Sequence, residues 1–142
     1  MAQVRDVMHR GVQCVDESET LVAAAKRMQE MHVGALPICG PDGRLTGMLT
    51  DRDIVVRCLA EGRDPATTTA GMLAQGTPVW VEAGADEREA LDLMADNAIR
   101  RLPVIEDHQV VGMMCVADVA AHLDGTAVAE LVASVSAAPA TS

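Results

Sequence analysis

The chain has 142 residues, which suits one compact domain or two small units that share a core. It carries 11 Lys and Arg against 21 Asp and Glu, and the formal charge of −10 argues against binding to nucleic acid or to anionic lipid. Hydrophobic residues make up 49% of the chain and aromatic residues 1%, so it is no disordered polypeptide and has too few rings to bind single strands by stacking.

The sequence is a tandem duplication of a unit of roughly 55 residues. Sliding the sequence over itself by 66 positions, or by 65 after a one-residue deletion in a turn, aligns identical residues in order. The matched pairs are Val15 with Val81, Met28 with Met94, Leu36 with Leu102, Pro37 with Pro103, Gly47 with Gly112, Met48 with Met113 and Asp53 with Asp118.

Each copy is predicted to begin with a short strand, at 12–15 and 78–81, followed by an amphipathic helix. The apolar residues of this helix recur every three or four positions in both copies, as one buried face requires. Thr20 and Asp86 stand where a capping residue would start the two helices, and Gly34 is predicted to end the first one.

A strand that opens with Leu-Pro follows at 36–39 and 102–105, and its proline favours an edge or first-strand position. After a turn, a third strand at 44–50 and 110–115 leads into a second helix, at 51–62 in the first copy and 116–123 in the second. Methionines recur in these elements, and we expect them to fill the core, since rings are scarce.

The order β-α-β-β-α, repeated, predicts a mixed α/β (α+β) fold of two repeats packed as a pseudo-twofold pair, with two equivalent clefts between them. One copy alone is too small to bury an adequate core. The predicted boundaries are 7–62 for the first repeat, 63–71 for a linker, 72–125 for the second repeat and 126–142 for a C-terminal tail.

No segment approaches the about 20 apolar residues of a membrane span, and the N-terminus lacks the apolar stretch of a secretory signal. We therefore expect a cytoplasmic protein with no membrane partner. No Ser/His/Asp set and no glycine-rich phosphate loop is found, so we expect no catalytic residues and no enzyme. The histidines (9, 32, 108, 122) and cysteines show no metal spacing, so we expect no metal site and place the histidines on the surface or in turns.

Two phrases, GALPICGPDGRLTGMLTDRDIV at 34–55 and IRRLPVIEDHQVVGMMCVADVA at 99–120, resemble the two halves of a CBS-domain pair, or Bateman module. The shared elements are the Leu-Pro strand, the turn, a glycine among apolar residues and an Asp that opens the next helix. The resemblance covers about residues 4 to 125 and extends to small stand-alone bacterial CBS proteins. It implies a regulatory module that commonly forms a homodimer and acts on a protein partner, whose identity the sequence does not give.

The resemblance also implies an adenosine nucleotide such as AMP or ATP, or S-adenosylmethionine, as ligand. The helix-opening Asp53 and Asp118 would accept hydrogen bonds from ribose hydroxyls, with Thr50 beside Asp53, whereas Cys115 replaces the hydroxyl in the second copy. A basic residue before the Leu-Pro strand often meets the phosphate in this family. Arg101, after Arg100, fills that position only in the second copy, and Arg52 is the candidate in the first. We therefore expect at most one tight site, on Thr50 and Asp53.

Each of these features also has a purely structural interpretation. Thr50 and Asp53 fit an ordinary capping box, and Arg100 and Arg101 fit a solvated helix end. A second hypothesis is therefore a stress-associated protein of the same fold that binds no nucleotide and responds to redox state or to metal.

The cysteines bear on that second hypothesis. Cys14 and Cys39 lie on strands that should be neighbours, where the second copy has Trp80 and Ile105. They are either reduced thiols, as the cytosol favours, or a disulfide with a Cα–Cα distance of roughly 4.4–6.8 Å. Cys58 and Cys115 are expected to be free and largely buried.

Overall fold

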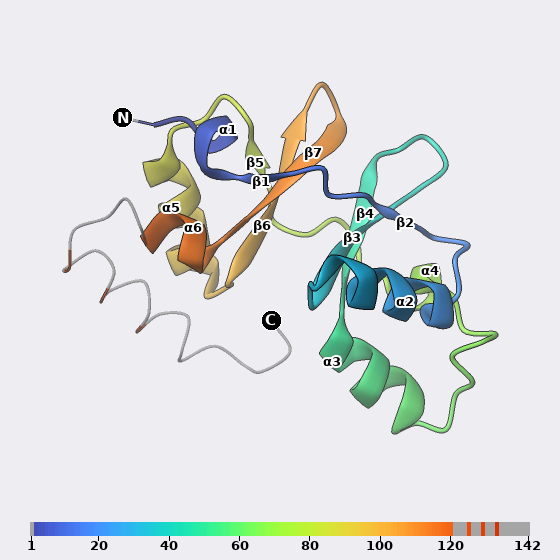
Figure 1. The fold of residues 1–142 in the computed structure, drawn as a ribbon. Coiled ribbons are helices and arrows are strands. Elements are labelled where there is room, and N and C mark those ends of the chain that lie inside the picture. Colours follow the sequence, from blue (N-terminus) through green and yellow to red (C-terminus); the bar gives the residue numbers. More distant parts are fainter. Residues whose placement is uncertain (1, 121–124, 126–128, 130–132, 134–142) are drawn as a thin grey trace. The chain divides into compact units, whose positions relative to one another are not determined.

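The computed structural model describes residues 2–120 together with 125, 129 and 133, and Figure 1 shows it as a ribbon. It confirms a mixed α/β fold with two compact units, each containing one small sheet. We call Gln13–Pro78 the first-repeat unit, and Met1–Val12 with Val79–Ser142 the second-repeat unit. The predicted helix end near Leu123, His122 and most of the tail at 126–142 lie outside the described residues.

The first-repeat unit has a three-stranded sheet in the order β2-β3-β4, parallel between β2 and β3 and antiparallel between β3 and β4. The side chains of Leu21 from the helix and of Leu36, Ile38 and Leu49 from the sheet are fully buried in its core. Its elements are β2 (Val15–Asp16), α2 (Leu21–Met31), β3 (Ala35–Cys39), β4 (Leu45–Thr50), α3 (Asp51–Asp53), the π-helical segment η1 (Ile54–Leu59) and α4 (Ala70–Leu73).

The second-repeat unit has a four-stranded sheet in the order β1-β7-β6-β5, with only the β5–β6 pair parallel. Met94, Leu102, Val104 and Met114 are fully buried in its core, so methionine does fill space here, as expected. Its elements are α1 (Val4–Val7), β1 (His9–Arg10), β5 (Val81–Glu82), α5 (Glu87–Asn97), β6 (Arg101–Glu106), β7 (Gln109–Cys115) and α6 (Val116–Ala120).

The two long helices start as predicted but end earlier than Gly34 suggested. The Thr20 side chain accepts a hydrogen bond from the Ala23 backbone N–H, and Asp86 accepts one from Glu89. Helix α2 ends at Met31 because His32 adopts a left-handed conformation, with φ of 55°, and Ala98 does the same after α5, with φ of 52°. The prediction that Gly34 stops the helix was therefore wrong, since the terminating turn is built from non-glycine residues in both copies.

The prolines of the Leu-Pro strands are the third residues of central strands, so the predicted edge or first-strand position was wrong. Strand β3 lies between β2 and β4, and β6 lies between β5 and β7. However, β2 pairs only with Ile38 and Cys39, and β5 only with Val104 and Ile105. Each proline precedes the paired stretch, so its missing N–H interrupts no ladder on that side.

The strands predicted at 12–15 and 78–81 are shorter and begin later, at Val15 and Val81, and two short helices, α1 and α4, were not predicted. The backbone N–H of Ala70 in α4 donates to Glu19 O at 2.8 Å, and the N–H of Val4 in α1 donates to Ala85 O at 2.8 Å. Because these contacts are equivalent under the 66-residue offset, the N-terminal segment completes the second repeat and the linker completes the first. Within the described residues, no helix is both long and apolar enough to cross a membrane.

Candidate functional site

The first candidate site is the start of helix α3, where Thr50 and Asp53 form a reciprocal capping box. The Thr50 hydroxyl accepts a hydrogen bond from the Asp53 backbone N–H at 3.0 Å, and Asp53 Oδ2 accepts one from the Thr50 N–H at 3.0 Å. Asp53 is 9% exposed. The structural interpretation of this pair is therefore correct, and a ligand function would have to use the remaining capacity of the same side chains.

That remaining capacity is on Asp53 Oδ1, which lies 4.0 Å from Nη1 of Arg57, one helical turn further on. The same Nη1 donates to the carbonyl of Leu73 at 2.8 Å, so Arg57 bridges the helix start and the end of α4. Sequence analysis missed Arg57, although its i,i+4 spacing from Asp53 is the signal that would have found it.

The basic candidate of the first copy, Arg52, is exposed and contributes its backbone N–H to Asp51 Oδ1 at 2.8 Å. The Asp51 carboxylate in turn lies over Gly34, where an added Cβ would lie 3.1 Å from Asp51 Oδ2. The position of Arg100 in the second copy is thus taken in the first copy by Gly34, which the Asp51 carboxylate covers.

The second candidate site is the start of helix α6, where Asp118 has the place of Asp53. Its Oδ2 accepts the Cys115 backbone N–H at 2.9 Å and the Cys115 thiol at 3.1 Å. Its Oδ1 lies 2.7 Å from Nε2 of His9. Burial, and next the hydrogen bond and negative charge of Asp118, raise the pKa of the Cys115 thiol. Cys115 is half-buried, so the expectation that it is largely buried was wrong.

Tertiary pairing brings His9 to this site. Strand β1 pairs antiparallel with β7, with His9 opposite Met113, so the His9 side chain is on the same face as Cys115, two residues along. Gly112 permits the approach, because a Cβ there would lie 2.6 Å from the His9 carbonyl oxygen. Local spacing cannot reveal a contact between the N-terminus and residue 118, and the sequence analysis missed it.

Arg101 lies at the same end of the sheet, directly across β6 and β7 from Cys115. It is half-exposed, and in the described part of the chain its guanidinium makes no hydrogen bond or ion pair. Arg100 is exposed, and its carbonyl accepts the Val116 N–H at 3.0 Å, as the Gly34 carbonyl accepts that of Asp51. The structure thus brings Arg101, Cys115 and Asp118 to one sheet end, and Thr50, Asp53 and Arg52 to the equivalent place in the other unit.

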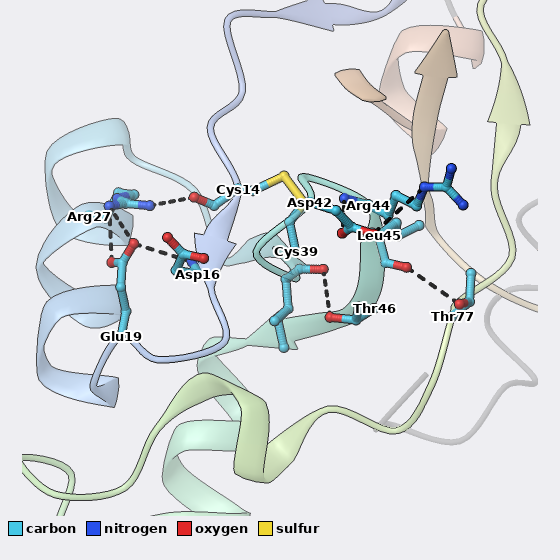
Figure 2. The surroundings of a disulfide bond; sticks show 11 residues. Cys14, Asp16, Glu19, Arg27, Cys39, Asp42, Arg44, Leu45, Thr46 and Thr77 are labelled. Carbon is cyan, nitrogen blue, oxygen red and sulfur yellow. Dashed lines mark hydrogen bonds and ion pairs between the residues drawn. A yellow bond between two sulfur atoms is a disulfide. The ribbon is translucent and has the colours of Figure 1, made fainter. Parts of the chain in front are cut away.

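A disulfide joins Cys14 to Cys39, with a Cα–Cα distance of 5.7 Å, inside the range expected for a bridge (Figure 2). Cys14 precedes β2, correcting the prediction that it lies within the first strand. Its carbonyl accepts a hydrogen bond from Arg27 of α2 at 2.7 Å, and Arg27 is also paired with Glu19 at 3.0 Å. The remaining described cysteine, Cys58, is free and buried, as expected.

A family model and individual relatives both match this chain over most of its length. Residues 4–59 and 73–125 match the family model of the CBS domain. Hypoxic response protein 1 of Mycobacterium tuberculosis is 50% identical over 135 residues, which cover 95% of this chain and 94% of that protein. The CBS domain-containing protein YhcV of Bacillus subtilis is 36% identical, with 86% of each chain covered.

Solved structures show the same fold. A crystal structure of Hypoxic Response Protein I with two coordinated zinc ions is 53% identical, with a TM-score of 0.79, over 87% of this chain and 100% of that chain. CBSX2 in complex with AMP shares the fold at 21% identity, with a TM-score of 0.72, over 86% of this chain and 96% of that chain. The resemblance found in the two phrases is thus confirmed.

Proposed function

Since the chain belongs to the CBS-domain family, we propose that it is a regulatory module that binds an adenosine nucleotide or related adenosyl ligand at the start of α3. Thr50 and Asp53 hold the ribose, and Arg52 holds the phosphate. A protein of this fold has been crystallised with AMP, which makes AMP the first ligand to test, before ATP and S-adenosylmethionine. We propose a regulatory role without catalysis, in the cytoplasm.

The observation that carries the proposal is that Oδ1 of Asp53 and Oδ1 of Asp118 differ in how closely a neighbouring side chain approaches them. Among the described residues, the charged neighbour of Asp53 Oδ1 is Arg57 at 4.0 Å, too long for a hydrogen bond, so this oxygen can accept one from a ribose hydroxyl. Asp118 Oδ1 is engaged with His9 at 2.7 Å, and a ribose there must displace the imidazole. Despite Arg101, the second site is therefore the weaker one.

Calorimetry with AMP, ATP and S-adenosylmethionine tests this assignment. Asp53→Ala is expected to abolish binding, and Asp118→Ala to have a smaller effect. Loss of one hydrogen bond to a buried hydroxyl costs about 1–3 kcal/mol, or about tenfold or more in affinity. Because Asp53 also caps a helix, Asp53→Asn is the second variant: it retains one acceptor oxygen for the Thr50 N–H but removes the other. Tight binding that survives Asp53→Asn, or equal losses from both sites, contradicts the assignment.

A second candidate function is a response to redox state or metal without nucleotide. The Cys14–Cys39 bridge favours the redox form, since a disulfide in a reducing cytoplasm is a switchable one. The crystallised relative with zinc ions favours the metal form. Absence of any binding at millimolar nucleotide would favour this second function over the first.

We also propose that the module is a homodimer. Segment η1 exposes Val55, Val56 and Leu59, an apolar helical surface of the kind that symmetric partners cover. Light scattering is expected to give twice the monomer mass of 14.9 kDa. A mass that stays at the monomer value on concentration contradicts the proposal.

A further inference from the structure

Three side chains with metal-binding atoms converge at the start of helix α6. One ligand atom each of His9, Cys115 and Asp118 lies within 4.8 Å of the other two. The pairwise contacts are His9 Nε2 to Asp118 Oδ1 at 2.7 Å and Cys115 Sγ to Asp118 Oδ2 at 3.1 Å. The three residues come from β1, the end of β7 and the first turn of α6.

Imidazole, thiolate and carboxylate are the donors that bind Zn²⁺ in proteins, at about 2.0–2.1, 2.3 and 2.0–2.2 Å respectively. Around a tetrahedral ion such bonds separate the donor atoms by about 3.4–3.6 Å. The three donor atoms lie within 4.8 Å of one another, so they need to approach by about 1 Å to reach the spacing that the ion imposes. We propose that His9, Cys115 and Asp118 form a Zn²⁺ site with three protein ligands and a fourth position for water.

The surrounding backbone holds the ligands ready for the ion. The Cys115 N–H bonded to Asp118 Oδ2 orients the carboxylate so that Oδ1 faces His9, the role that outer hydrogen bonds have in metal sites. The His9 side chain is 67% exposed, which leaves it room to turn and leaves the fourth position in contact with solvent. Gly112 maintains the short distance between β1 and β7.

Binding is balanced by proton release. The Cys115 thiol loses its proton to solvent as the Sγ–metal bond forms. The proton that His9 Nε2 donates to Asp118 Oδ1 leaves through solvent, so that Nε2 binds the metal and the neutral ring carries its one proton on Nδ1. In the second repeat, the ion binds the Asp118 carboxylate, which a ribose would also need as its hydrogen-bond acceptor. The site does not depend on nucleotide binding by the first repeat, and either can fail without the other.

The first repeat provides the internal reference. At the equivalent helix start it has Thr50 in place of Cys115, and the 66-residue offset places Gln75 at the position of His9. Asp53 is retained there, so a carboxylate alone is common to both repeats. The substitutions Cys115→Thr and His9→Gln therefore give the second site the residues that the first repeat already tolerates.

The test is a titration of the oxidised full-length chain with Co²⁺, followed by competition with Zn²⁺. The expected result is one equivalent of Co²⁺ with the charge-transfer band of a cobalt–thiolate bond and the visible bands of tetrahedral coordination, both removed by Zn²⁺. Cys115→Thr abolishes the thiolate band, and His9→Gln weakens Zn²⁺ binding at least about tenfold. His108→Gln, which removes an exposed turn histidine of the same unit, leaves binding unchanged.

Three results would each overturn the site: no thiolate band in the wild-type chain, a band that persists in Cys115→Thr, or equal Zn²⁺ affinity in His9→Gln and wild type. Circular dichroism of each variant confirms that the chain is folded in the comparison. No nucleotide is present, so the outcome is independent of the ligand proposed for the first repeat.

Discussion

The starts of helices α3 and α6 share one capping hydrogen bond but differ in the groups around it. In both, an aspartate three residues into the helix accepts the N–H of the capping residue, at 3.0 Å for Asp53 and 2.9 Å for Asp118. In the first-repeat unit the other carboxylate oxygen remains available, whereas in the second-repeat unit it is held by His9. A duplicated helix cap can thus keep its structural role in both copies while the second carboxylate oxygen has a different neighbour in each.

The difference originates in the segment that completes each repeat, which does not directly precede that repeat in the chain. In the second-repeat unit, the N-terminal residues form strand β1 against β7 and bring His9 to the site. In the first-repeat unit, residues 70–77 contribute α4, and the Thr77 hydroxyl donates a 3.4 Å hydrogen bond to the Leu45 carbonyl without forming a strand. Accordingly, Gly112 faces the backbone of His9, and the equivalent Gly47 faces Ala74.

The largest expected effect is on the disulfide, which only the first-repeat unit has. It closes a loop of 25 residues, and its reduction is expected to lower the free energy of unfolding by about 3 kcal/mol. Hydrogen exchange measured by segment is expected to show faster exchange in β2 and β3 after reduction, with β5 and β6 unchanged. Equal loss of protection in both sheets would show that the bridge does not act on its own unit.

The second effect is a difference in stability between alanine substitutions at Gly112 and at the equivalent Gly47. Gly112→Ala places a Cβ 2.6 Å from a backbone oxygen, so β1 must move, and we expect a loss of about 1–3 kcal/mol in stability. Gly47→Ala meets the Ala74 Cβ at 3.1 Å and is expected to cost less. Urea denaturation measures both variants. A larger loss for Gly47→Ala would contradict the close approach of β1 to β7.

The smallest effect is on the reactivity of the Cys115 thiol. Burial and Asp118 raise its pKa, so little thiolate is present at neutral pH and alkylation is expected to be slow, accelerating only at alkaline pH. Asp118→Asn removes the charge while keeping an acceptor, which lowers the pKa and shifts the rate profile to lower pH. Mass spectrometry after iodoacetamide treatment assigns the modified cysteine. An unchanged profile in Asp118→Asn would mean that burial alone sets the reactivity.

Sequence patterns predicted the features that repeat within a few residues. The helix caps at Thr20 and Asp86, the Thr50–Asp53 box and the turn before β4 follow from local hydrogen bonding, which the residue types themselves encode. The helix end at His32 was missed because a non-glycine left-handed residue gives no composition signal. The central position of Pro37 was missed because the length of the neighbouring strand β2 decides whether its absent N–H matters.

By itself, the sequence determined that the chain is a duplicated β-α-β-β-α unit, because alternating and helical apolar periods reflect which face of each element is buried. It also determined that each repeat carries a helix with an Asp at its third position, Asp53 in the first copy and Asp118 in the second. Only the tertiary structure decided that the N-terminal segment completes the second repeat and that His9 meets Asp118. Contacts between residues so distant in the chain depend on which exposed backbone edge a short segment pairs with, and no local spacing records that choice.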